Sequence, residues 1–148
     1  MKINNLGKSQ VPLISDRDNQ GKVEKSPGHF ASELLNSQET QYQEKLNKLM
    51  EQIQEQGTNL SQAPTYGELK SYRELVRQFI GEAVGRMYAV SSDRGWDRQG
   101  RQKMFTIIKK IDNTLSDMAE DVRVGQERQL DIMAKHDAIR GMLVDLYM

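Results

Sequence analysis

The last third of the chain, from Arg101 to Met148, carries a hydrophobic pattern that few folds can accommodate. Thirteen positions follow one another in alternating steps of four and three, and ten of them are large and apolar. This spacing places the side chains on one face of an α-helix that meets partner helices. It predicts long amphipathic helices and almost no strand. The positions are Met104, Ile108, Ile111, Leu115, Met118, Val122, Gly125, Gln129, Ile132, His136, Ile139, Leu143 and Leu146.

The weak middle of this stripe, Gly125 through Gln129, leaves two architectures open. Either the segment forms two helices separated by a break near Gly125, or one helix of about 70 Å runs from Arg101 to Met148. The single helix would leave part of the stripe exposed and would require a partner or a second copy. We expect a turn or kink at residues 125–129. His136 also lies on the stripe, where a packed or edge-lying histidine is more common than a metal ligand.

Earlier in the chain, apolar stripes of helical spacing are bounded by recognisable start and stop signals. Ser26 followed by Pro27 is a good helix start, and Gly57 is a natural stop. Thr65 with Glu68 forms a capping-box pattern that opens a second helix. We therefore predict an all-α protein, an antiparallel bundle of long helices. It has four helices, or three with a very long C-terminal helix, and the boundaries lie near 27–56, 65–90, 98–124 and 127–147.

Residues 1–25 differ from the rest in being rich in Asn, Ser, Gln, Lys and Asp without any periodic apolar face. Such a segment cannot bury enough apolar surface to offset the entropy of ordering. We predict a flexible N-terminal arm over residues 1–25 and a helical bundle domain over residues 26–148. The chain has no cysteine and no run approaching the roughly 20 apolar residues of a membrane span, so a soluble, cytoplasmic protein is expected.

Charge is unevenly distributed although the net charge is zero. Residues 65–110 carry 10 basic and 5 acidic groups, and residues 111–148 carry 4 and 8. Such segments can lie side by side in a bundle and help to select neighbouring helices. The alternative is an anion-binding surface in the basic segment 94–103, where the only tryptophan stands among cations. Its candidate interaction residues are Arg94, Trp96, Arg98, Arg101 and Lys103. The other interpretation of Trp96 is a plug at the end of the bundle.

Catalytic chemistry is missing from the sequence. The two histidines, His29 and His136, belong to no spaced ligand set, and no nucleophile or phosphate-binding loop motif occurs. We therefore predict no catalytic residues, no metal and no cofactor. The function expected is that of a non-enzymatic interaction or adaptor protein, with an unidentified protein partner, or of a homo-oligomer. The alternative is binding of nucleic acid or another anion through segment 94–103, against which zero net charge argues.

The C-terminal half resembles the YaaR family of small bacterial helical proteins. The resemblance rests on Trp96-Asp97-Arg98, on Gly100-Arg101 leading into the run IIKKID at 107–112, and on the ending from Ile139 to Tyr147. The opening MKIN also matches. The resemblance implies a bacterial, all-helical, cytoplasmic protein. It implies no activity, because the family has no established catalytic or binding residues to carry over.

Overall fold

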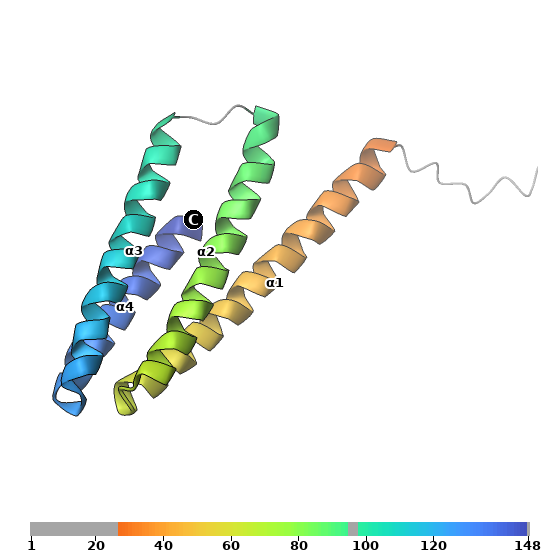
Figure 1. Ribbon diagram of the computed structural model, residues 1–148. Coiled ribbons are helices and arrows are strands. Elements are labelled where there is room, and N and C mark those ends of the chain that lie inside the picture. Colours follow the sequence, from red (N-terminus) through yellow and green to blue (C-terminus); the bar gives the residue numbers. More distant parts are fainter. Residues whose placement is uncertain (1–26, 95–97, 148) are drawn as a thin grey trace, which may run out of the picture. The chain divides into compact units, whose positions relative to one another are not determined.

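The computed structural model describes residues 27–94 and 98–147, and this part of the chain forms four α-helices and no strand. The helices are α1 (Pro27–Gln62), α2 (Tyr66–Arg94), α3 (Arg98–Val124) and α4 (Gln129–Tyr147) (Figure 1). One turn of 3-10 helix, η3 (Gln126–Arg128), precedes α4. The predicted all-α bundle is confirmed, with four helices. The predicted arm, residues 1–25, lies outside the described residues.

Contacts within the chain divide it into two compact units, Met1–Gln38 and Glu39–Met148. In the first unit the structure describes residues 27–38, which belong to α1. The helix begins at Pro27, as predicted, because proline has the right φ and lacks an N–H that would have no partner in the first turn. The second unit holds the rest of α1 together with α2, α3 and α4.

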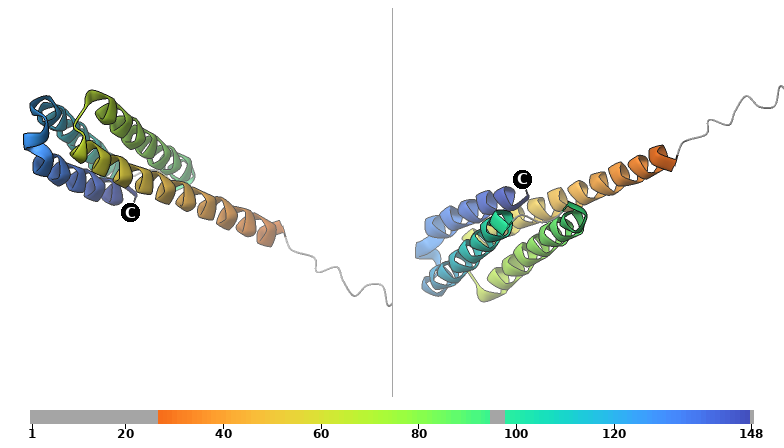
Figure 2. Two further views of the ribbon diagram at one scale, coloured as in Figure 1. Left: turned by 90° about the horizontal axis from the view of Figure 1, so that it is seen from below. Right: turned by 90° about the horizontal axis from the view of Figure 1, so that it is seen from above.

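Within the second unit, neighbouring helices run antiparallel. Lys45 of α1 pairs with Glu82 of α2 at 2.7 Å, and Gln56 donates a hydrogen bond to the backbone oxygen of Glu68 at 3.1 Å. A residue later in α1 contacts a residue earlier in α2, so the two helices run in opposite directions. Helices α3 and α4 lie side by side in all views (Figures 1 and 2).

The core of the second unit consists of apolar side chains from all four helices. Its most completely buried members include Ile53 of α1, Tyr72 of α2, Met118 of α3 and Ile139 of α4, each with no exposed surface. The apolar stripe that the sequence shows from Met104 to Leu146 supplies much of this core. The buried apolar residues are Leu46, Leu49, Ile53, Leu60, Leu69, Tyr72, Val76, Phe79, Ala83, Met104, Ile111, Leu115, Met118, Val122, Ile132, Ile139, Leu143 and Leu146.

The prediction that Gly57 stops the first helix is wrong, because α1 continues to Gln62. Gly57 is a buried helical residue five positions before the end of α1, where a Cβ atom would lie only 2.5 Å from Nδ1 of His136. The residue is glycine because the histidine ring of α4 packs directly on the α1 backbone. Burial of Leu60, with no exposed surface, holds the last turn beyond it in place.

The connection between α1 and α2 is short, and Thr65 caps the N-terminus of α2 as predicted. The backbone N–H of Glu68 donates to Oγ1 of Thr65 at 3.2 Å, which satisfies one of the free donors in the first turn of α2. Helix α2 then runs to Arg94, beyond the predicted end at residue 90. No other part of the described chain packs closely on Gly81 or Gly85, since a Cβ atom at either would meet nothing within 4 Å.

The break in the C-terminal stripe falls at Gly125, as expected, so the single 70 Å helix does not form. Gly125 has φ of 90°, a conformation that residues with a Cβ rarely adopt. Its N–H donates to the carbonyl of Asp121 at 3.1 Å, and its own carbonyl accepts from the N–H of Arg128 at 3.0 Å. These bonds close α3 and start η3.

Candidate functional site

The predicted basic segment is only partly covered by the structure. Trp96 and the side chain of Arg94 lie outside the described residues, whereas Arg98, Arg101 and Lys103 are exposed on the first turns of α3. Arg101 and Lys103 are two residues apart and therefore point about 200° apart around the helix. These two cations do not share one face of α3. The candidate interaction residues remain a prediction.

Two kinds of site find no support in the described part of the chain. Within residues 27–94 and 98–147, no three His, Cys, Asp or Glu side chains are grouped so that they could hold a metal ion. In the same residues, no helix has both the length and the apolar character that crossing a bilayer requires.

A buried polar pair joins α2 to α4 in the core. The hydroxyl of Tyr72 and Nδ1 of His136 are hydrogen-bonded at 2.8 Å, and the two rings meet edge to face with centroids 5.5 Å apart. Burial lowers the pKa of His136 and raises the pKa of Tyr72, so both side chains are neutral near pH 7. Their exposed fractions are 1% and 0%, which denies a substrate access. The pair is a packing device, as expected for a histidine on the apolar stripe.

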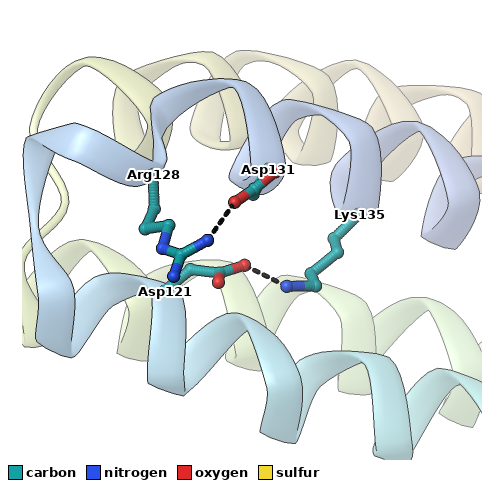
Figure 3. Close-up of polar contacts among 4 residues, drawn as sticks. All are labelled: Asp121, Arg128, Asp131 and Lys135. Carbon is teal, nitrogen blue, oxygen red and sulfur yellow. Dashed lines mark hydrogen bonds and ion pairs between the residues drawn. The ribbon is translucent and has the colours of Figure 1, made fainter.

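A second polar cluster lies where α3 turns into α4 (Figure 3). The side chain of Asp121, near the end of α3, is only 10% exposed and forms an ion pair with Lys135 of α4. Arg128 of η3 donates to Asp131 at 3.0 Å, and this hydrogen bond is the main reason why the pKa of Arg128 is raised. Two acids and two bases thus neutralise one another. The Asp121–Lys135 pair ties α3 to α4, and the Arg128–Asp131 pair ties η3 to the first turn of α4.

The first unit presents an apolar surface on α1. Phe30, Leu34 and Leu35 are 64%, 49% and 58% exposed, and they follow one another at helical spacing. All described residues before Glu39 are exposed, and the first buried residue of α1 is Leu46. In the sequence, these residues begin the apolar stripe of helical spacing that continues along α1.

A line of cations on α2 forms one further surface, which was not predicted from the sequence. Tyr66, Leu69, Lys70, Arg73, Glu74 and Arg77 surround a hollow of about 200 Å³. Their spacing and the excess of positive charge over residues 65–110 were visible in the sequence. These cations were not recognised as a separate surface, because they lie on the same helical turns as the apolar stripe of α2.

Comparison with known proteins gives the same picture of a helical family without an assigned activity. Residues 3–147 match the family described as "Protein of unknown function (DUF327)". The chain is 22% identical over 152 residues to the uncharacterised protein YaaR of Bacillus subtilis strain 168, and the match covers 99% of each chain.

Two solved structures share the fold. The uncharacterised protein BH1478 of Bacillus halodurans has a TM-score of 0.67 and 32% identity, with 79% of this chain and 97% of that chain covered. Protein TM1646 of Thermotoga maritima, described as DUF327, has a TM-score of 0.65 and 21% identity, with 80% and 97% covered. The second likeness concerns the fold alone.

Proposed function

This chain belongs to the DUF327 family of proteins of unknown function, and we propose that it acts as a non-enzymatic protein that binds another protein through its helical faces. The observation that carries the proposal is the exposed apolar surface of α1, formed by Phe30, Leu34 and Leu35. We call these three residues the α1 apolar face. The partner surface proposed is the apolar face or groove of a helical protein.

Burial of the α1 apolar face against a partner would contribute a substantial favourable free energy to binding. Complete burial of one large apolar side chain contributes about 1.5–3 kcal/mol, and the three side chains are about half exposed or more. Part of this gain is offset by the entropy of association. Side chains at i, i+4 and i+5 project from one side of a helix, which is how amphipathic helices dock into grooves. His29 and Glu33, 3.3 Å apart, provide polar groups on the same turns.

Site-specific photo-cross-linking in the native cell tests this proposal. A cross-linking amino acid at Leu34 is expected to capture one discrete partner protein, and the same group at Gln52, an exposed polar position of the same helix, is expected not to. Adding Phe30→Ser and Leu35→Ser should abolish the Leu34 adduct. Equal capture from both positions, no adduct at all, or an adduct of the chain only with itself would each overturn the proposal of a partner protein.

The alternative function is binding of nucleic acid or another anion through segment 94–103. It is supported by the first turn of α3, which carries cations and no acidic side chain. Cations at a helix N-terminus oppose the helix dipole, so a bound anion would relieve an unfavourable arrangement. Binding to single- or double-stranded probes should weaken steeply with salt and should drop on Arg98→Glu. Undetectable binding at low ionic strength would eliminate this alternative.

A further inference from the structure

Helix α2 carries two stripes rather than one. Its buried residues, from Leu69 to Ala83, form the stripe that faces the core. A second stripe consists of Tyr66, Lys70, Arg73 and Arg77, which follow one another in steps of four, three and four. We call these four residues the α2 basic stripe. The steps are those by which one helix lies along another.

The charges of the α2 basic stripe lack the partners that other charges of α2 have. Toward α1, Glu82 pairs with Lys45, and Arg86 pairs with Glu39. In contrast, Lys70, Arg73 and Arg77 form no ion pair with any residue in the described part of the chain. Three cations with one acid, Glu74, give this side of the helix a net charge of +2. The bundle therefore leaves this side unneutralised.

Arg73 adds a specific requirement. Its Nε atom is buried and has no hydrogen-bond partner among the described residues. A buried N–H donor without an acceptor is energetically unfavourable. Arginine offers donors in a planar fork that matches the two oxygens of a carboxylate. Because Nε itself is out of reach of solvent, the donors that a carboxylate from outside the chain can bind are the terminal NH2 groups of the same guanidinium, which are not buried.

The hollow beside Arg73 has the size and lining to receive such a group. Its volume of about 200 Å³ exceeds that of a carboxylate. Leu69, with 3% exposed surface, is among the residues lining it, and Tyr66, 65% exposed, is another. An apolar residue and an aromatic ring beside a row of cations suit a side chain with an apolar stem and an anionic end. Glutamate has this construction.

We propose that the α2 basic stripe binds an acidic helix of a partner protein, with Asp or Glu side chains spaced in steps of four and three. The proposal rests on the proposed function of protein binding but concerns a different surface. Tyr66 to Arg77 spans about 16 Å at 1.5 Å per residue, which is the length of three turns of such a helix. A duplex nucleic acid is disfavoured, because Glu74 stands among only three cations and a phosphate backbone would need a longer basic surface.

The test uses two synthetic helical peptides of the same composition. One carries glutamates in steps of four, three and four, and the other distributes the same glutamates around the helix. Fluorescence anisotropy with the full chain should show binding of the first peptide that is about tenfold tighter than binding of the second. Binding of the first should weaken between about 50 and 200 mM salt, as expected for exposed charge pairs. Equal binding of the two peptides would overturn the proposal.

The variant Arg73→Gln with Arg77→Gln should reduce binding of the first peptide by about tenfold or more. The matched control, Lys109→Gln with Lys110→Gln, removes two exposed cations of α3 and should change binding by less than about twofold. Thermal melts of both variants establish that they are folded. Equal losses in the two variants, or binding of a DNA duplex that the peptide does not displace, would contradict a site for an acidic helix.

Failure of this proposal can be separated from failure of the proposed function. The Leu34 cross-link is measured on the Arg73→Gln, Arg77→Gln variant as well. If the cross-link persists while peptide binding shows no dependence on the α2 basic stripe, only the assignment of that stripe is wrong. If peptide binding follows the predicted pattern while the cross-link is absent, the α1 apolar face is not the docking surface.

Discussion

The hydroxyl of Tyr72 on α2 lies 2.8 Å from Nδ1 of His136 on α4, and the histidine ring packs against the backbone of α1 at Gly57. Three helices thus meet at one buried hydrogen bond. The arrangement depends on a missing side chain, because the ring occupies the space where a Cβ atom of residue 57 would be. A residue that looks like a helix stop is instead a packing requirement.

Gly57→Ala is therefore expected to destabilise the protein. Its Cβ atom would lie within 2.7 Å of three atoms of the His136 ring, so either the ring or α1 must move. Overpacking of this kind costs about 1–3 kcal/mol. Chemical denaturation monitored by circular dichroism measures the loss. Gly81→Ala is the matched control, because its Cβ atom meets nothing, and it should stabilise α2 by about 0.5–1 kcal/mol. Similar effects of the two changes would contradict the packing described for Gly57.

The stability of the fold should fall in mildly acidic solution because of His136. Burial lowers the pKa of this histidine in the folded state, with Arg140 acting in the same direction and Asp137 opposing it. The unfolded chain then binds a proton more readily than the folded chain. The histidine-linked stability is present above the unfolded pKa of about 6.5 and is lost as the pH falls below it.

Denaturation midpoints between pH 8 and pH 5 measure this effect. His136→Leu should make the decline with falling pH shallower, whereas His29→Gln, which changes the chain's other and exposed histidine, should leave it unchanged. Tyr72 acts at the opposite end of the scale. Its pKa is raised by burial, so its contribution is present below pH 10 and is lost as the pH rises further. An unaltered acid decline in His136→Leu would show that other groups cause it.

Removing one partner of the Asp121–Lys135 pair should cost more than breaking an exposed pair. Lys135→Met leaves the carboxylate of Asp121, whose side chain is 10% exposed, without its cation. The expected loss is about 1–3 kcal/mol. Arg123→Met breaks the exposed pair with Glu120 and should change stability by less than about 1 kcal/mol. A double-mutant cycle with Asp121→Asn isolates the coupling. A coupling near zero would show that the pair does not tie α3 to α4.

Gly125→Ala should disturb the turn and alter the oligomeric state. An alanine at φ of 90° is strained by about 1–2 kcal/mol, although nothing obstructs its Cβ atom. The apolar stripes of α3 and α4 are in phase across Gly125, so a continuous helix would keep the stripe intact. We expect a lower melting temperature and a shift, by light scattering, toward a species of twice the mass through helix exchange. Gly141→Ala, within α4, should cause neither change.

The local pattern of residues along the chain was sufficient to predict some features of this structure and insufficient to predict others. The four helices and the break at Gly125 follow from spacing along the chain and from the backbone freedom of one glycine. The end of α1 does not, because Gly57 is explained by a ring 79 positions away in sequence, and such a contact leaves no local signal. Likewise, the cations of α2 were visible, but only the folded bundle shows that Arg73 lacks an acceptor while Arg86 has one.

The short connection between α3 and α4 influences the order in which the helices fold. Helices α3 and α4 are separated by Gly125 and one turn of 3-10 helix, so their contacts require little loop closure, whereas Tyr72 and His136 are 64 positions apart. We expect the α3–α4 hairpin to form before the transition state and the contact with Gly57 and Tyr72 to form after it. Changes at Lys135 should then slow refolding, and changes at Gly57 should mainly accelerate unfolding. The protein would lose α1 from its core first when it begins to unfold.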